Sequence, residues 1–269
     1  MIECLHPGLS ASRTRVVLFD FDGTLSLLRA GWMDVMVSMM LEVLAELKTG
    51  ESETELELLV KDYVARLTGK QTIYQMIELA NQVKSRGGQP LEPLAYKKLY
   101  HDRLMEKISD RREALREGKE SPDEYLVPGA RALLDSLKAR GFRLYCASGT
   151  DHAYTVEEAE LLQITPYFDG GIYGAQDDYK SFSKAMLIQK IISSMECRGD
   201  ELLGFGDGYV EIKNVKDVGG IAVGVATDEP DCRKMDQWKR DRLAGVGADY
   251  IIPNYLCRDE LLKTLFAVE

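Results

Sequence analysis

The stretch that decides the fold is Val16-Val17-Leu18-Phe19-Asp20-Phe21-Asp22-Gly23-Thr24-Leu25. Its four leading apolar residues, two of them β-branched, predict a short buried strand. Residues i and i+2 of an extended chain face the same side, so Asp20 and Asp22 are expected at one crevice beyond the strand's carboxyl end, where open α/β sheets bind ligands. Two adjacent carboxylates repel each other, and a divalent metal is the natural counter-charge. The alternative is an ordinary turn in which Asp and Gly are common residues.

Composition limits the class of protein and its partners. The 269 residues carry a formal net charge of −10, which disfavours nucleic acid or an anionic membrane as a general partner. No apolar run approaches the roughly 18–20 residues of a membrane span, and the first residues lack the pattern of a secretory signal. The five cysteines are scattered without a CxxC pair, which predicts reduced thiols, a cytoplasmic location and no structural zinc site. A monomer and a homodimer both remain open.

The region that follows the first strand is predicted to be helical throughout. Apolar residues at helical spacing begin at Trp32 and recur as far as Leu47. Further helices are expected over residues 54–67, 72–86 and 92–117, the last one long and charged. No credible strand interrupts this region, so we expect a helical bundle inserted after the first strand.

From residue 125 onward, strands are predicted to alternate with helices. The expected strands cover residues 142–147, 168–173, 201–206, 220–225 and 248–252. This alternation indicates βαβ units and a parallel sheet. The predicted fold is therefore a doubly wound, Rossmann-like α/β core of residues 1–27 and 124–269, interrupted by an inserted α-helical cap of residues 28–123.

Four polar clusters lie at or near the carboxyl ends of the predicted strands, and their order carries a resemblance. The clusters are Asp20-Phe21-Asp22-Gly23-Thr24, Cys146-Ala147-Ser148-Gly149-Thr150, Phe182-Ser183-Lys184 and Gly206-Asp207-Gly208-Tyr209-Val210-Glu211. In this order and spacing they resemble the motifs of the haloacid dehalogenase superfamily, whose members are mostly phosphatases and phosphotransferases. The first and last motifs are specific, whereas the middle two are weak when taken singly.

The resemblance implies catalysis through an aspartyl-phosphate. Asp20 would attack phosphorus, which splits one hard displacement into two easier ones, and Asp22 would act first as general acid and then as general base. Ser148 and the backbone N–H of Gly149 would donate hydrogen bonds to the phosphoryl oxygens, with Thr150 beside them as a substrate-binding residue. A lysine would offset the phosphoryl charge. Lys184 is the candidate that matches the motif, and Lys180 is the alternative.

The resemblance also implies Mg²⁺ as the cofactor, because a carboxylate that approaches a phosphate needs cations to neutralise the site. The Asp20 carboxylate, the Asp22 backbone carbonyl and the Asp207 carboxylate would bind the ion. Glu211, at a position where aspartate is commoner in the family, would bind it directly or through a water molecule. The presence of Asp22 argues against the dehalogenase branch, which lacks an aspartate there.

The cap is expected to select the substrate, because the core would contact only the phosphoryl group. Arg29 and Lys70 are its candidate specificity residues, although a structural role for Arg29 and simple exposure for Lys70 are the ordinary alternatives. The predicted function is hydrolysis of a small phosphorylated metabolite. The rival hypotheses are a phosphomutase or phosphotransferase acting on a sugar phosphate, a phosphonate hydrolase with Lys70 as a Schiff base, and a non-catalytic ligand-binding or regulatory protein of the same fold.

Overall fold

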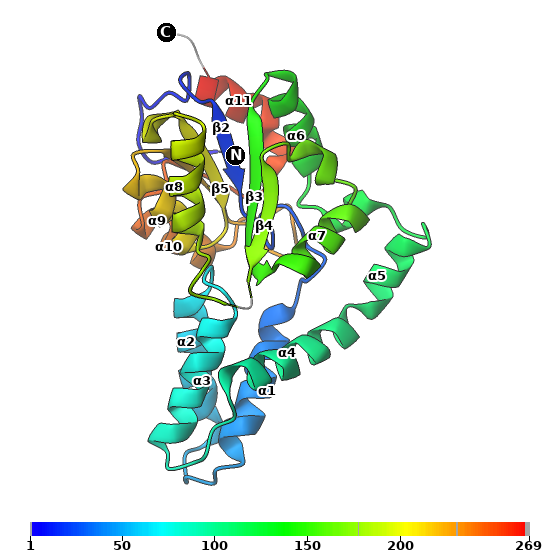
Figure 1. Cartoon of the computed structure of the whole chain (residues 1–269), viewed down its shortest axis with the longest axis vertical. Helices are drawn as coiled ribbons and strands as arrows, with labels where there is room; N and C mark the ends of the chain where they lie inside the picture. Colours follow the sequence, from blue (N-terminus) through cyan, green and yellow to red (C-terminus); the bar gives the residue numbers. More distant parts are fainter. Residues whose placement is uncertain (1, 177, 230, 267–269) are drawn as a thin grey trace. The chain divides into compact units, whose positions relative to one another are not determined.

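The chain divides into two compact units. The computed structural model describes residues 2–176, 178–229 and 231–266, and the units are Met1–Leu28 with Ala114–Glu269, and Arg29–Glu113 (Figure 1). After the helical unit, the first unit resumes at Ala114 and not at residue 124, where the sequence predicted it. The reason is that Leu115 already belongs to the hydrophobic core of the first unit. No helix in the described part of the chain is both long and apolar enough to span a membrane.

The first unit is built on a seven-stranded sheet in the order β1-β7-β6-β5-β2-β3-β4. Its strands are β1 (Glu3–Cys4), β2 (Val16–Phe19), β3 (Arg143–Asp151), β4 (Gly171–Ala175), β5 (Leu202–Gly206), β6 (Ile221–Val225) and β7 (Tyr250–Ile252). β2 pairs in parallel with β5 on one side and with β3 on the other. The predicted doubly wound α/β core is confirmed. The short edge strand β1, which pairs antiparallel with β7, was not predicted.

Helices cover both faces of this sheet (Figure 1). One face packs against α6 (Ala130–Ala139), α7 (His152–Leu161) and α11 (Arg258–Phe266), and the other against α8 (Lys184–Ser194), α9 (Tyr209–Asp217) and α10 (Gln237–Gly245). The side chains of β2 alternate accordingly: Val17 and Phe19 enter the first core, and Val16 and Leu18 the second. Short 3₁₀ helices lie at Pro122–Tyr125, Thr165–Tyr167, Gly199–Glu201 and Tyr255–Cys257.

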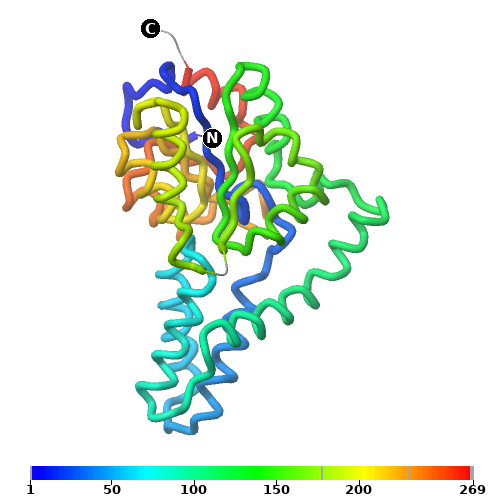
Figure 2. The backbone as a smooth tube through the Cα atoms, in the orientation of Figure 1, coloured from blue at the N-terminus to red at the C-terminus, as the bar shows by residue number. Residues whose placement is uncertain are grey.

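The second unit is a helical bundle with its own core, and Figure 2 traces it from blue through cyan into green. Its helices are α1 (Trp32–Ala45), α2 (Glu53–Leu67), α3 (Ile73–Ser85) and α4 (Pro93–Lys107), and α5 (Ser109–Arg116) crosses the boundary to the first unit. The start of α2 is fixed by a capping box in which Ser52 and Glu55 exchange hydrogen bonds.

The expectation of one long helix over residues 92–117 was wrong. The chain leaves helical geometry at Ile108, whose φ and ψ are −101° and 6°. The Ile108 side chain is fully buried in the core of the bundle. Apolar spacing within a charged sequence does not reveal such a break, because residues on both sides of it keep helical periodicity.

The centre of the sheet provides a test of the core. Phe19 of β2 stacks on Phe205 of β5 with ring centroids 4.7 Å apart, and both side chains are buried. Phe19→Ala is expected to lower the free energy of unfolding by about 3–5 kcal/mol, because it leaves a cavity between two central strands. Urea denaturation followed by circular dichroism measures this change. Leu256→Ala, at a side chain that is 65% exposed, should change stability by less than about 0.5 kcal/mol, and equal losses in the two variants would contradict this core.

Candidate active site

The candidate site lies at the carboxyl end of β2, in the middle of the sheet. Asp20 follows the strand directly, and its backbone N–H still donates to the carbonyl of Phe205 at 2.9 Å, so its buried side chain is held at the strand end. The chain then turns sharply, with the N–H groups of Leu25 and Ser26 donating to the carbonyl of Phe21. This is the crevice at which both aspartates were expected.

Gly23 makes this turn possible and brings a third carboxylate to it. Its φ is +75°, in the left-handed region that glycine adopts readily. A Cβ atom at this position would lie 2.2 Å from Oδ2 of Asp207, so the Asp207 carboxylate lies directly against the Gly23 backbone. Asp207 itself follows β5, the strand beside β2. Residue 23 must therefore lack a side chain if Asp207 is to reach the turn.

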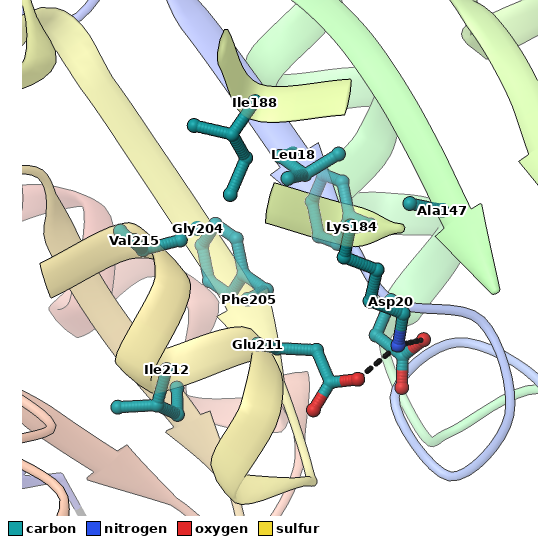
Figure 3. Close-up of a pocket in the computed structure, with 11 residues that line it drawn as sticks. Leu18, Asp20, Ala147, Lys184, Ile188, Gly204, Phe205, Glu211, Ile212 and Val215 are labelled. Atoms are coloured by element: carbon teal, nitrogen blue, oxygen red, sulfur yellow. Dashed lines mark hydrogen bonds and ion pairs between the residues drawn. The ribbon is translucent and has the colours of Figure 1, made fainter. Parts of the chain in front are cut away.

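Lys184 lies between two buried carboxylates of this site (Figure 3). Ser183 caps α8 by accepting a hydrogen bond from the backbone N–H of Met186, which makes Lys184 the first residue of the helix. Its Nζ donates to Oδ1 of Asp20 at 2.7 Å and also forms an ion pair with Glu211. The alternative lysine, Lys180, is exposed. The structure thus brings Lys184 to Asp20.

Asp22 is held by two hydroxyl groups of β3. Oγ of Ser148 donates to Oδ2 of Asp22 at 3.2 Å, and Oγ1 of Thr150 donates to the same oxygen at 2.9 Å. The two side chains reach it because β3 continues to Asp151, beyond its expected end at residue 147, with a shift of register against β4 between Ala147 and Asp151. Gly149 lies between the two donors in this segment, and the role expected for its N–H remains a prediction.

Glu211 reaches the site from the first turn of α9. A Cβ at Gly206 would lie 2.6 Å from Cβ of Glu211, so this glycine lets the helix fold back closely over the end of β5. One carboxylate oxygen of Glu211, Oε1, is paired with Lys184. The other, Oε2, is buried without a hydrogen-bond partner. A buried carboxylate oxygen in this condition is costly unless a donor or cation meets it.

Lys239 is a further residue of the site, and it was not predicted from the sequence. It lies in the first turn of α10, and its Nζ donates to Oδ2 of Asp207 and to Oε1 of Glu229, both at 3.1 Å. Its side chain is only 14% exposed. Asp236, the N-cap of α10, marks a helix start in the sequence, but it does not distinguish Lys239 from an ordinary exposed lysine.

The electrostatics of the site show a shortage of positive charge around the nucleophile candidate. Burial raises the pKa of the Asp20 carboxyl well above its usual range; Lys184 lowers it, and Glu211 and Asp207 raise it further. Burial lowers the pKa of Lys184, but Asp20 and Glu211 outweigh that effect, so its pKa lies above the ordinary lysine value. An attacking carboxylate must be ionised, and further positive charge would favour that form.

The residues present fit a divalent cation by charge and by donor type. Within the described residues no cluster of three or more His, Cys, Asp or Glu side chains is arranged as a ready metal cage, and Lys184 lies between two of the expected ligands. When all are ionised, the carboxylates around the two lysines exceed the ammonium groups by two negative charges. The groups counted are the carboxylates of Asp20, Asp207, Glu211 and Glu229 and the ammonium groups of Lys184 and Lys239. The buried Oε2 of Glu211 is a suitable further donor.

The two candidate specificity residues belong to the helical unit. Arg29 is its first residue, and Lys70 follows α2 with an exposed side chain whose Nζ lies 5.8 Å from the ring centroid of Tyr74. Their part in substrate selection remains a prediction.

The chain belongs to the haloacid dehalogenase-like hydrolase family, whose model matches residues 14–219. Three solved structures have a similar fold. A predicted phosphatase from Clostridium acetobutylicum is 21% identical with a TM-score of 0.60, covering 95% of this chain and 99% of that one. A β-phosphoglucomutase from Clostridium difficile is 14% identical with a TM-score of 0.54, covering 86% and 98%. A HAD family hydrolase from Deinococcus radiodurans, with bound phosphate and sodium, is 16% identical with a TM-score of 0.54, covering 94% and 97%. No curated protein matches the sequence.

The buried ion pairs of Lys184 give a prediction about stability. Lys184→Met is expected to lower the free energy of unfolding by about 3–5 kcal/mol, because it leaves the carboxylates of Asp20 and Glu211 buried without a counter-charge. Urea denaturation in buffer with EDTA measures the loss. The matched control is Lys180→Met, at an exposed lysine four residues earlier, which should change stability by less than about 0.5 kcal/mol. A larger loss of stability in Lys180→Met than in Lys184→Met would contradict the pairing of Lys184 with the two carboxylates and favour Lys180 as their partner.

Proposed function

We propose that the protein is a Mg²⁺-dependent phosphatase that hydrolyses a small phosphorylated metabolite through an aspartyl-phosphate on Asp20. The observation that carries this proposal is that the two aspartates have different partners in the structure. Asp20 is buried against the ammonium of Lys184, whereas Asp22 is held by two hydroxyl groups. Membership of a hydrolase family and the similar fold of a predicted phosphatase support it.

In the first step a carboxylate oxygen of Asp20 attacks phosphorus, and the bond from phosphorus to the leaving oxygen breaks. Lys184 offsets negative charge at the reacting atoms. Asp22 donates a proton to the leaving alkoxide.

In the second step water attacks the phosphorus of the aspartyl-phosphate. Asp22, now ionised, takes a proton from the water, and the bond between phosphorus and Asp20 breaks to release inorganic phosphate. The Thr150 hydroxyl keeps Asp22 in place through both steps, since it donates to an oxygen that accepts in either protonation state. The single O–H of Ser148, which meets Asp22 in the structure, would turn to a phosphoryl oxygen when substrate binds, beside the N–H of Gly149.

The Asp20 carboxylate, the Asp22 carbonyl and the carboxylates of Asp207 and Glu211 are the proposed ligands of Mg²⁺. When bound, the ion would supply the positive charge that favours the ionised form of Asp20 and neutralises the phosphoryl group. The unsatisfied Oε2 of Glu211 and the excess of carboxylates support this assignment.

The helical unit is proposed to act as the cap that selects the leaving group, with Arg29 and Lys70 as its candidate contacts. The proposed partner is one small phosphorylated molecule, and neither nucleic acid nor a membrane, in keeping with the net charge of −10. A cytoplasmic location and a monomeric or homodimeric state complete the proposal.

Asp20→Asn is expected to abolish hydrolysis of p-nitrophenyl phosphate, because an amide oxygen is a poor nucleophile. Phosphate release measures this, and EDTA should abolish wild-type activity until Mg²⁺ is restored. Asp259→Asn, at a side chain that is 86% exposed, is the matched control and should keep full activity. Full activity in Asp20→Asn would exclude the proposed nucleophile.

The same residues would serve a phosphomutase if a sugar hydroxyl replaced water as the acceptor. Incubation with a panel of phosphorylated sugars, glycolate, glycerol and nucleotides, followed by ³¹P NMR, separates the two activities. Free phosphate supports the hydrolase, and an isomerised sugar phosphate without free phosphate would overturn it. No turnover of any ester with Mg²⁺ present would favour a non-catalytic role.

Thr150 provides a test that separates its two possible roles. If it positions Asp22, Thr150→Val should lower kcat by about 10- to 100-fold with little change in KM, because a misplaced general acid loses part of its usual contribution. Thr150→Ser keeps the hydroxyl and should keep most of the activity. A rise in KM at unchanged kcat would instead support the predicted substrate-binding role.

A further inference from the structure

Lys239 is a largely covered lysine of the site, and it lies outside the family's motifs. The family match ends at residue 219, and both Lys239 and its partner Glu229 come after it. The residue is fixed by the start of α10, where the carboxylate of Asp236 accepts a hydrogen bond from the backbone N–H of Lys239. The backbone position of this lysine is thus determined independently of its side-chain partners.

The ammonium of Lys239 is shared between two carboxylates. Its Nζ lies 3.1 Å from Oδ2 of Asp207 and 3.1 Å from Oε1 of Glu229. A lysine between two carboxylates is positively charged at neutral pH. A positive charge therefore lies directly beside Asp207, one of the proposed cation ligands.

Asp207 has little freedom to move away from this charge. On its other side the carboxylate lies against Gly23, where a Cβ would come within 2.2 Å of Oδ2. Its side chain is only 13% exposed, so solvent screens the Lys239 ammonium weakly. A cation bound through Asp207 would have to share this carboxylate with the ammonium.

We propose that Lys239 and Glu229 together set the affinity of the active site for its divalent cation, with Lys239 weakening and Glu229 strengthening the binding. This inference rests on the metal site of the proposed function. The Coulomb energy scales with the product of the charges, so a dication is repelled twice as strongly as a single charge at the same distance. Glu229 offsets part of this repulsion by sharing the ammonium.

A purely positioning role for Lys239 predicts the opposite result. If its hydrogen bond only oriented Asp207, removal of the ammonium would loosen a ligand and weaken cation binding. Asp207 is already confined by the Gly23 turn, so we expect the loss of repulsion to dominate. The sign of the change in affinity therefore distinguishes the two roles.

The test is calorimetric titration of Mn²⁺ and Mg²⁺ into the full chain after treatment with EDTA. Lys239→Gln keeps a hydrogen-bond donor but removes the charge, and it should tighten binding about tenfold or more. Glu229→Gln leaves the ammonium to Asp207 alone and should weaken binding several-fold. The matched control is Lys213→Gln, at an exposed lysine of α9 paired with Asp217, which should leave affinity unchanged.

Each outcome either supports or overturns the inference. If the wild type binds the cations and Lys239→Gln binds them equally or more weakly, the inference is wrong and the proposed function is unaffected. If circular dichroism shows that Lys239→Gln does not fold, Glu229→Gln decides: weaker binding supports the inference, and unchanged or tighter binding overturns it. If the wild type binds neither cation, the inference falls together with the Mg²⁺ site of the proposed function.

Discussion

The arrangement of the site depends on one buried ammonium group. Lys184 joins β2, α8 and α9 through residues 164 and 27 positions away in the sequence. Buried charges are destabilising unless they are paired. Each of the two carboxylates and the lysine is therefore stable in this buried position only when its partner is also there. The Ser183 cap and the close approach at Gly206 are the local devices that place the lysine and the glutamate there.

Much of the core was predictable because its signals are local. Four apolar residues before Asp20 suffice to identify a central strand, and alternation with helices gives the parallel sheet. Lys184 could be preferred over Lys180 because it follows Ser183 at a helix start. The two-residue strand β1 and the break at Ile108 have no such signal, since pairing at an edge and burial within a bundle depend on distant parts of the chain.

The residue types of the site could be predicted from the sequence, but which side chains contact one another could be predicted less well. Thr150 was expected beside the phosphoryl group. In the structure its hydroxyl donates to Asp22 from the part of β3 in which the register shifts, and its role in substrate binding stays a prediction. Lys239 escaped notice because its partnership with Asp207 depends on how α10 packs. Single lysines in polar stretches are usually exposed, so the sequence offers no reason to select this one.

The insertion of the helical unit between β2 and β3 has a consequence for how such chains diversify. The seven strands that the structure describes all belong to the first unit. For the pairing of β2 with β3, the stretch from Arg29 to Glu113 is therefore part of the loop that this pairing closes. The entropy of closing a loop grows only logarithmically, by about 0.6 kcal/mol for each doubling of its length. Insertions, deletions or wholesale replacement in this stretch therefore cost the sheet little, and the bundle can drift in size and sequence while the chemistry at the end of β2 stays the same.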